Sequence, residues 1–575
     1  MLKLFRFLKP FTAMIIGALV LVFLQTIGDL YLPTLMADII NDGVMHGDTE
    51  KIIQIGGLML IVAGVGAVCA VIASLLSSKA AVGLGTVLRS KVFQRVESYS
   101  LNEFDKLGTA TLITRTTNDI NQVQMVTVMI MRLMVSAPMM AIGGVIMAFQ
   151  EDRTLTWVLV VAIPVLALVV LSIASQAIPL FRLIQVKIDK INLVLREKLT
   201  GIRVIRAFNT EEHEKKRFEE ANVDLTNTYI KVNRIMAFMM PGIMLVMNLT
   251  SLSILWFGGI RISHGNMDLG ALAAFTQYAM QIMFSMLMLA LMFVMVPRAQ
   301  AAAVRINEVL DIIPEITDAR ETKKSFARTG YVEFKNVTFS YQGAEEPVLR
   351  NISFSAQPGE VTAIIGSTGS GKSTLINLIP RFYDIDSGSI HVDGVDIREM
   401  AQEILRAKIG FVPQKAFLFS GSITDNIKFG NDKATEKEIK YAADVAQAAE
   451  FITNMDGGFD YKITQGGTNV SGGQKQRLAI ARALVRKPEV YIFDDSFSAL
   501  DFKTDARLRA ALKKETTEAA VIIVAQRVGT VMDANRIIVL DEGRIAGMGT
   551  HKELLGNCEV YREIVSSQMS EEEIA

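Results

Sequence analysis

The residues that most clearly indicate chemistry form one glycine-rich stretch, Gly366 to Ser373. Its spacing, G-x-x-x-x-G-K-S, is that of a phosphate-binding loop, in which backbone N–H groups surround phosphate oxygens. The apolar run 361–365 before it predicts a strand, and the residues from Thr374 predict a helix whose positive N-terminal end attracts phosphate. A glycine-rich turn that contains Lys-Ser by chance is the alternative, and the predicted strand and helix argue against it.

Each part of this loop has a distinct expected role. Lys372 can reach the β- and γ-phosphates of a nucleotide, and the hydroxyl of Ser373 can ligate Mg²⁺. The glycines let the backbone approach a ligand with no Cβ in the way. The sequence therefore predicts a nucleotide and Mg²⁺ as cofactors. The loop residues predicted to bind the nucleotide are Gly366, Ser367, Thr368, Gly369, Ser370, Gly371, Lys372, Ser373 and Thr374.

The apolar residues divide the 575-residue chain, which is 50% hydrophobic, into two unlike halves. Before about residue 300, six apolar runs are long enough to cross a bilayer, which takes about 20 residues. Buried core helices of a large soluble domain are the alternative, and six such runs in one half disfavour it. The runs cover residues 12–36, 53–76, 125–149, 155–180, 235–261 and 270–297.

The charges between the runs predict the orientation in the membrane. Lys3, Arg6 and Lys9 precede the first run, and the loops after the second and fourth runs carry most of the other Lys and Arg residues of this half. By the positive-inside rule, both termini and these two loops are cytoplasmic. The first run lacks a small-residue cleavage site, so we expect no cleavable signal peptide.

The two long loops, residues 77–124 and 181–234, are polar and helix-compatible. We expect the flanking spans to continue through them as helices and to turn at Ser98–Asp105 and Thr210–His213. A short helix at each turn could press on a partner domain. A solvated linker is the alternative interpretation of both loops.

The second half has the composition of a soluble α/β domain. Short apolar strands alternate with helical patterns, at residues 331–334, 361–365, 409–412, 490–493, 521–524 and 536–539. We therefore divide the chain into a transmembrane domain (1–300), a linker (301–329) and a nucleotide-binding domain (330–575). Cys69 and Cys558 lie in different halves and indicate no disulfide framework or zinc site. The net charge is zero, so nothing favours nucleic acid as a partner.

Further motifs of the second half resemble those of ATP-binding cassette (ABC) proteins, in that family's order. Any one of them is modest evidence, whereas together they are specific. They are Tyr341 in V-T-F-S-Y, Gln414 in V-P-Q, the signature residues Ser471, Gly472, Gly473 and Gln474 in V-S-G-G-Q-K-Q-R, the Walker B aspartate Asp494 and the D-loop aspartate Asp501 in S-A-L-D.

The resemblance covers essentially the whole chain and implies a fold. Six spanning helices before one such domain resemble a half-transporter of the ABC exporter type. The implied architecture is an α-helical transmembrane domain of six long helices, followed by an α/β P-loop ATPase domain. The implied cofactors are ATP and Mg²⁺.

The resemblance also assigns roles to single residues. Ser373, Gln414 and Asp494 would hold Mg²⁺, and Tyr341 would stack on adenine. A core aromatic beside Phe339 is the other interpretation of Tyr341. The signature would close on the γ-phosphate held by a partner's phosphate-binding loop. Taken alone, Ser-Gly-Gly is more often a helix cap.

Two residues depart from the family pattern at one place. The residue after the Walker B aspartate is usually Glu and is thought to polarise the attacking water, but here it is Asp495, which is one methylene shorter. The switch region usually carries His, but here it carries Gln526. A shorter carboxylate loses reach to the water, and a neutral amide cannot take up a proton. We therefore expect Asp495 and Gln526, at the catalytic positions, to form a site that binds ATP but hydrolyses it poorly.

The signature, in contrast, is close to the family consensus. This asymmetry resembles one half of a heterodimeric bacterial multidrug exporter. The expected partner is a second ABC half-transporter that has the usual Walker B Glu and switch His. The expected function is ATP-driven efflux of amphipathic drugs or other hydrophobic compounds across the cytoplasmic membrane by alternating access. An exporter or flippase of one lipid or peptide, a homodimeric exporter, and an ATP-gated channel or regulator are the alternatives.

Two features of the spans bear on the substrate. The charged residues Asp29 and Arg132 lie inside spans one and three, where a charge is costly unless it is paired or hydrated. Flexible methionines suit a surface that fits many apolar shapes, although they are equally compatible with simple helix packing. Spans five and six contain Met236, Met239, Met240, Met244, Met247, Met280, Met283, Met286 and Met288.

Overall fold

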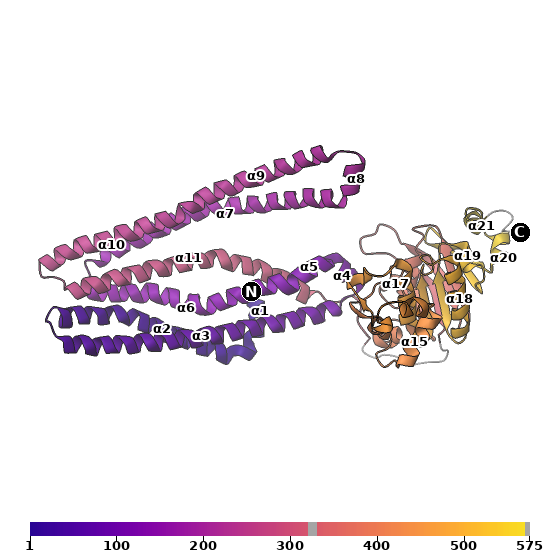
Figure 1. Ribbon diagram of the computed structural model, residues 1–575, viewed down its shortest axis with the longest axis horizontal. Coiled ribbons are helices and arrows are strands. Elements are labelled where there is room, and N and C mark those ends of the chain that lie inside the picture. The colour runs from indigo at the N-terminus through magenta and orange to yellow at the C-terminus, as the bar shows by residue number, and fades with distance from the viewer. Residues whose placement is uncertain (320–329, 570–575) are drawn as a thin grey trace. The chain divides into compact units, whose positions relative to one another are not determined.

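The protein is described here by a computed structural model of residues 1–319 and 330–569, and it divides into two compact units. The helical unit comprises Met1–Glu97 and Thr109–Ile312. The sheet unit comprises Ser98–Gly108 and the chain from Ile313 onward. Figure 1 shows both units with most of their helices labelled.

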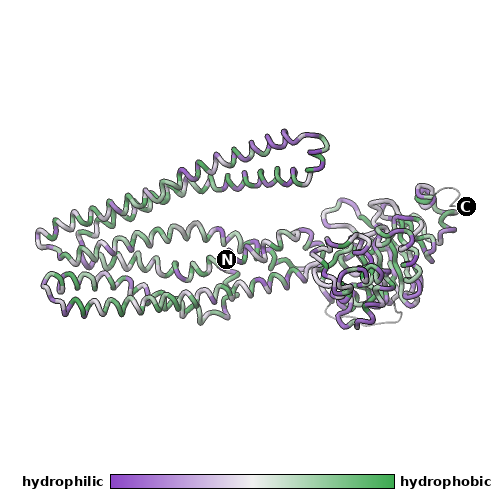
Figure 2. The backbone as a smooth tube through the Cα atoms, viewed as in Figure 1, coloured by the Kyte–Doolittle hydropathy of each residue, from purple (hydrophilic) through white to green (hydrophobic). Residues whose placement is uncertain are grey.

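Six helical segments of the helical unit are long and apolar enough to cross a membrane, as the sequence predicts. In a helix, the backbone N–H and C=O groups bond to one another. This is required in a membrane, because lipid tails offer no hydrogen-bond partners. Figure 2 shows hydrophobic residues along most of these helices, whereas α9 is largely hydrophilic. The helices are α2 (Thr12–Asp38), α3 (Thr49–Glu97), α6 (Ile120–Glu151), α7 (Thr156–Thr200), α9 (Glu211–Ala237) with α10 (Met239–Ser263), and α11 (Leu269–Asp311).

These helices pack mainly in pairs. Helix α2 lies along α3, α6 lies along α11, and α7 lies along α9 and α10. Small residues allow close approach: a Cβ at Gly144 of α6 would come within 2.7 Å of the Ile282 side chain of α11. Contacts of this kind drive helix association in lipid, where apolar surface gains nothing from being hidden from water.

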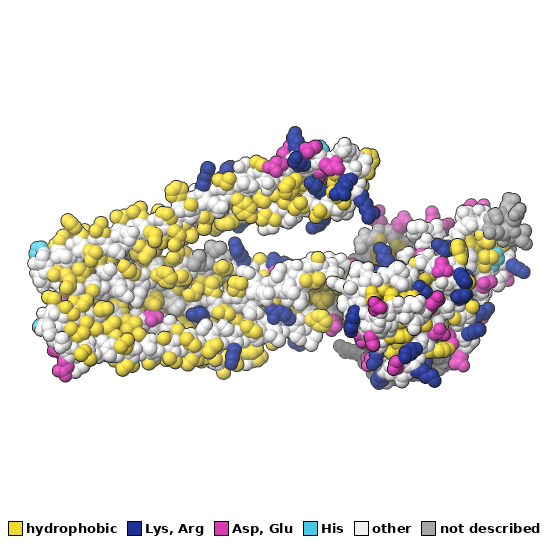
Figure 3. Space-filling model, viewed as in Figure 1, with side chains coloured by type: hydrophobic (Ala, Val, Ile, Leu, Met, Phe, Trp, Pro, Cys, Tyr) yellow, Lys and Arg dark blue, Asp and Glu magenta, His cyan; other side chains and the backbone are white. Residues whose placement is uncertain are grey.

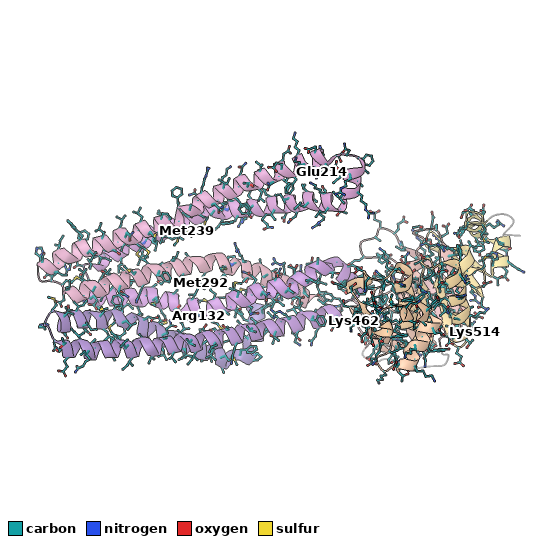
Figure 4. The ribbon with its side chains drawn as sticks, in the orientation of Figure 1. Arg132, Glu214, Met239, Met292, Lys462 and Lys514 are labelled. Atoms are coloured by element: carbon teal, nitrogen blue, oxygen red, sulfur yellow. The ribbon has the colours of Figure 1, made fainter. Side chains whose placement is uncertain are left out.

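The charged side chains inside the spans bond to neighbouring polar groups. Asp29 accepts a hydrogen bond from Gln25 one turn earlier (3.4 Å), and Arg132 of α6 donates to Ser74 of α3 (3.5 Å). Figure 4 labels Arg132 on α6. Among the described residues, no ion pair joins the two.

The long loops are helical extensions, as the sequence predicts. The first ends in helix α4 (Leu101–Leu107), which belongs to the sheet unit. There the Glu103 carboxylate accepts from the Glu315 N–H (2.9 Å), and Asn102 donates to the Glu315 side chain (3.0 Å).

The second loop turns at α8 (Ile202–Ala207) and the residues up to Thr210, earlier than the predicted Thr210–His213, because α9 already begins at Glu211. Helix α8 belongs to the helical unit. Figure 3 shows Lys and Arg side chains gathered around this end of α7 and α9, beyond the apolar surface of the spans.

Helix α11 continues through Asp311, into the segment where the sequence suggests a linker. Ion pairs hold this extension against Arg115–Asp119, the helical segment directly before α6. The Arg305 guanidinium donates to both carboxylate oxygens of Asp119 (2.7 and 2.5 Å), and Arg115 pairs with Glu308 (3.0 Å). Part of the expected linker, residues 320–329, lies outside the described residues.

The sheet unit is built on a six-stranded sheet with the order β12-β11-β3-β10-β9-β6, parallel except for β12. A four-stranded antiparallel sheet has the order β2-β1-β4-β5. The six predicted strands are confirmed, although β1 extends further than expected. The strands are β1 (Val332–Phe339), β2 (Leu349–Ala356), β3 (Val361–Gly366), β4 (Ser387–Val392), β5 (Val395–Asp396), β6 (Ile409–Val412), β9 (Val490–Asp494), β10 (Ala520–Val524), β11 (Arg536–Asp541) and β12 (Arg544–Gly549).

Strand β9 shows how the core positions the site. All five of its residues are buried. Val490 and Ile492 belong to the core shared with the four-stranded sheet, whereas Tyr491 and Phe493 face helices α15 (Glu436–Val445) and α17 (Gly472–Leu484). Because β3 and β9 are both parallel to β10, their carboxyl ends meet at one edge of the sheet, which is where ligands bind in open α/β sheets.

Candidate nucleotide site

The glycine-rich loop joins β3 to helix α12 (Lys372–Leu378), as its sequence predicts. Gly371 caps the helix with a φ of 96°, and Gly369 has a φ of 86°, values that favour glycine. A Cβ at Gly366 would collide with the backbone carbonyl of Leu540. The loop therefore exposes its backbone N–H groups at a helix N-terminus, which suits an anion.

Lys372 folds back across the loop. Its ammonium donates to the carbonyl oxygens of Gly366 (2.9 Å) and Ser367 (2.7 Å). Burial lowers the pKa of Lys372, while the carboxylates of Asp495 and Asp494 act in the opposite direction. The cation thus lies within a cradle of acceptors, close to two acidic groups.

Ser373 and Asp494 lie side by side, as expected for residues that share a cation. The Ser373 hydroxyl donates to Asp494 Oδ1 (3.1 Å). Burial raises the pKa of Asp494, and a bound cation would favour its ionised form. A hydroxyl and a carboxylate are hard oxygen ligands of the kind Mg²⁺ takes, usually together with water and phosphate, so the donor set fits this ion. No group of three or more His, Cys, Asp or Glu side chains suited to a metal occurs among the described residues.

Asp495 is held by two neutral amides. Gln526 donates to Asp495 Oδ2 (3.0 Å), and Gln414 donates to the same oxygen (3.4 Å). Burial raises the pKa of Asp495, and the hydrogen bond from Gln414 partly opposes this. The sequence-predicted catalytic pair is therefore in direct contact, and Gln414 lies with Asp495 rather than with Ser373 and Asp494.

Gln568 contacts the switch segment in a way that the sequence does not indicate. This residue follows helix α21 (Glu559–Ser566) near the end of the described chain. Its amide nitrogen donates to the carbonyl of Gln526 (2.8 Å), and its amide oxygen accepts from the N–H of Val528 (2.8 Å). Gln568 thus fixes the backbone on both sides of Arg527. A glutamine near a chain end has no local pattern that could have identified it.

Tyr341 packs in an aromatic cluster and also contacts the phosphate-binding loop, while its predicted stacking on adenine stays a prediction. Its ring packs edge-on against Phe339 (centroids 5.0 Å apart) and Tyr383 (5.3 Å), and its side chain is half-buried. Its hydroxyl bonds to Thr374 Oγ1 of α12 (3.0 Å). Tyr341 is therefore anchored in an aromatic cluster and tied to the phosphate-binding loop.

The signature forms the start of α17. Ser471 is the N-cap: its hydroxyl accepts from the Gln474 N–H (3.3 Å), and the Gln474 side chain accepts from the Ser471 N–H (2.9 Å). Ser471 and Gly472 are exposed. Among the described residues, no hydrogen bond or ion pair joins the signature to the phosphate-binding loop. Asp501 caps the next long helix, α18 (Phe502–Glu515), by accepting from the Thr504 N–H (2.9 Å).

Comparison with known families matches both parts of the chain. The model described as "ABC transporter transmembrane region" matches residues 14–286, and the model described as "ABC transporter" matches residues 349–498. The second match contains the phosphate-binding loop, Gln414, the signature and Asp494.

Relatives align along nearly the full length. A Mycobacterium tuberculosis protein named as an ABC transporter ATP-binding protein is 42% identical over 565 residues, which cover 98% of this chain and 97% of the relative. A Bacillus subtilis protein of the same description is 38% identical over 572 residues, 100% and 99% of the two chains. An ATP-dependent lipid A-core flippase of Syntrophus aciditrophicus is 31% identical over 487 residues, 85% and 81%.

The fold matches a solved structure titled as a bacterial Atm1-family ABC exporter with ATP bound. The TM-score is 0.80, with 24% identity, over 97% of this chain and 99% of that one. At this identity the match concerns the fold. It bears out the architecture of six spanning helices followed by an α/β domain.

Proposed function

The chain belongs to the ABC transporter family, and we propose that it forms one half of a heterodimeric exporter of amphipathic compounds. Its family makes it a multi-pass membrane protein that couples ATP hydrolysis to transport. The proposal adds the division of labour between two chains and the class of substrate. By the distribution of positive charge, the sheet unit and both termini lie in the cytoplasm.

The contact between Asp495 and Gln526 carries this proposal. A general base must be within hydrogen-bond reach of the water it activates. The carboxylate of Asp495 is shorter than the usual Glu and accepts from two amides on one oxygen. Gln526 can donate to a phosphate, but it cannot carry the positive charge that a histidine can. This site therefore binds ATP and hydrolyses it slowly.

The remaining site residues have the roles that their geometry supports. The loop backbone and Lys372 hold the phosphates, Tyr341 stacks on the adenine, and Ser373 with Asp494 holds Mg²⁺, with Gln414 approaching from the side of Asp495. Bound Mg²⁺ neutralises charge on the phosphates. Ser471 and the glycines after it act on the nucleotide of the partner, where exposed N–H groups and a hydroxyl can face a γ-phosphate.

The proposed substrate class is inferred from the methionines of the membrane-spanning helices. Met240 and Met244 of α10 and Met280 of α11 are about half exposed. Figure 4 labels Met239, where α9 meets α10. A flexible thioether surface accommodates varied apolar shapes. A single lipid is the second candidate substrate, because one relative is named a lipid A-core flippase.

The proposal is tested by co-expressing the chain with a second half-transporter that has the usual Walker B Glu and switch His, and reconstituting the purified product into liposomes. We expect a one-to-one complex whose ATPase exceeds that of this chain alone by at least about tenfold, given the 10²–10⁴-fold value of a well-placed base. The complex should export an amphipathic dye such as Hoechst 33342. Rapid hydrolysis by this chain alone would support a homodimer instead. Flipping of a labelled lipid without dye export would support the lipid candidate.

A further inference from the structure

The sheet unit contains a cavity of about 450 Å³ that is open to solvent, with Glu515 and Glu518 exposed at its rim, away from the nucleotide site. Its walls come from α15, the end of α17, the turn before β9, and the end of α18. Figure 1 labels these three helices, and Figure 4 labels Lys514, which directly precedes the lining residue Glu515. Because Tyr491 lies near the amino end of β9 and Asp494 at its carboxyl end, the cavity lies toward the opposite edge of the sheet from Asp494. Its volume is within the range of pockets that hold small molecules, about 300–1,000 Å³.

The side chains around this cavity carry more negative than positive charge. Four glutamates line it, and two form ion pairs: Glu438 with Lys487 (2.8 Å), and Glu489 with Lys408 (2.5 Å), a lysine that also pairs with Asp393 (2.6 Å). The other two, Glu515 and Glu518, have no cationic partner among the described residues. Glu515 accepts a hydrogen bond from the Tyr441 hydroxyl. The cavity thus retains an excess of negative charge on one side.

A buried tyrosine provides a second, independent observation. Tyr491 lines the cavity although its side chain belongs to the core and is only 4% exposed. Its hydroxyl has no hydrogen-bond partner among the residues that the structure describes. Burial, and then the charge of Glu515, raises the pKa of Tyr491 to about 12. The hydroxyl is not among the enclosed side-chain atoms that lack a partner, so it is open to the cavity and can form a hydrogen bond with a ligand there.

We propose that this cavity binds a small organic ammonium ion with an apolar body. The ammonium group lies between Glu515 and Glu518, where it supplies the missing positive charge and hydrogen-bond donors. The apolar body packs against Val445 and Leu484, beside the tyrosine rings of the wall. Aromatic rings add attraction for a cation. The hydroxyl of Tyr491 is satisfied by the polar end of the ligand.

Occupancy of this cavity should be linked to nucleotide binding, because three of its wall elements carry nucleotide-site residues at their other ends. Strand β9 runs from Tyr491 to Asp494, α17 runs from the signature to Leu484, and α18 runs from the cap Asp501 to Glu515. A ligand that fixes the position of one end of these elements also affects the position of the other end. By thermodynamic linkage, ATP binding then changes the affinity of the cavity for its ligand by the same factor. We therefore expect a change in ATP affinity when the cavity is filled.

The test uses the full chain in lipid nanodiscs and tyramine, an aromatic primary ammonium, as the probe. Isothermal titration calorimetry should show saturable binding. Tyrosol, which has a hydroxyl in place of the ammonium, should bind at least tenfold more weakly. The double variant Glu515→Gln/Glu518→Gln should lose at least tenfold in tyramine affinity, and Tyr491→Phe a few-fold. The matched control is Glu559→Gln/Glu563→Gln, which removes two exposed glutamates of α21 and should bind tyramine as the wild type does.

The same titration with ATP present checks the linkage, and unfolding temperatures show that the variants are folded. The proposal is overturned if tyramine does not bind, or if the Glu515/Glu518 double variant binds it with wild-type affinity, because the probe then occupies another site such as the spans. Equal binding of tyrosol and tyramine also overturns it, since recognition would then not involve charge.

Discussion

The signature and the switch segment lie on the same unit but use their polar groups in different ways. At the signature, one capping box satisfies Ser471 and Gln474, while Ser471 and Gly472 stay exposed. At the switch, one oxygen of the Asp495 carboxylate, Oδ2, accepts hydrogen bonds from Gln526 and Gln414 of the chain itself. The first region can present donors to another molecule, whereas the second uses its acceptor internally. This difference supports the proposal that the signature of this chain assists hydrolysis at the partner's nucleotide site, whereas this chain's own site hydrolyses ATP slowly.

The largest effect should come from Ser471. In the proposed heterodimer, Ser471→Ala removes a hydroxyl that faces the partner's γ-phosphate, and loss of such a donor costs about 10²–10³-fold in rate. We expect steady-state ATPase to fall about a hundredfold. Because alanine also weakens the helix cap by about 1 kcal/mol, Ser471→Thr is the control, and it should retain most activity. Near-normal ATPase in Ser471→Ala would reverse the assignment of sites to chains.

Lys372 should matter for binding at this chain's own site. Lys372→Ala removes the ammonium next to the phosphates, and hydrogen bonds to charged groups contribute about 1.5–3 kcal/mol. We expect photolabelling of this chain by 8-azido-ATP to need about tenfold more nucleotide. Labelling of the partner and part of the ATPase should persist. Complete loss of both ATPase and transport would mean that this site is catalytically required.

Replacing Gln568 should have a smaller effect, because this residue only positions the backbone of the switch segment. Gln568→Ala removes two hydrogen bonds to the backbone around Arg527, each with a net value of about 1 kcal/mol. We expect the nucleotide affinity of this chain's site to fall about threefold while kcat of the heterodimer stays unchanged. Ser567→Ala, an exposed neighbour, is the control. Equal changes in both quantities, or an effect only on the unfolding temperature, would indicate a purely structural role.

The smallest effect, and the sharpest test of the comparison, should come from Asp495. Asp495→Asn changes a carboxylate that is one methylene shorter than the usual Glu and whose Oδ2 already accepts from two amides, so heterodimer ATPase should stay within about twofold of wild type. The matching Glu→Gln change in the partner should lower ATPase by about 10²–10⁴-fold. A hundredfold loss in Asp495→Asn would show that Asp495 is a working base and that the two regions are not divided as proposed.

The spans and strands were predictable because their signals are local. An apolar run of sufficient length must be a helix in lipid, and a short apolar run before a glycine-rich loop is a buried strand. The loop residues, Asp494 and Asp495 could be identified because their chemistry is tied to their spacing. The length of α11 was harder to predict, since its last turns are held by Arg305 and Asp119, residues far apart in the chain.

The sequence by itself determined the family, the nucleotide loop and the two substitutions at Asp495 and Gln526, because each depends on residue type at a fixed spacing. Only the tertiary structure decided that these two side chains touch, that Gln568 holds the backbone beside them, and that Tyr491 opens into a cavity lined by glutamates. At the switch, the contacts join residues that are 31 and 42 positions apart in the chain. At the cavity, the lining residues come from four separate elements. Distances of that kind are set by how the strands and helices pack, and no local pattern in the chain encodes them.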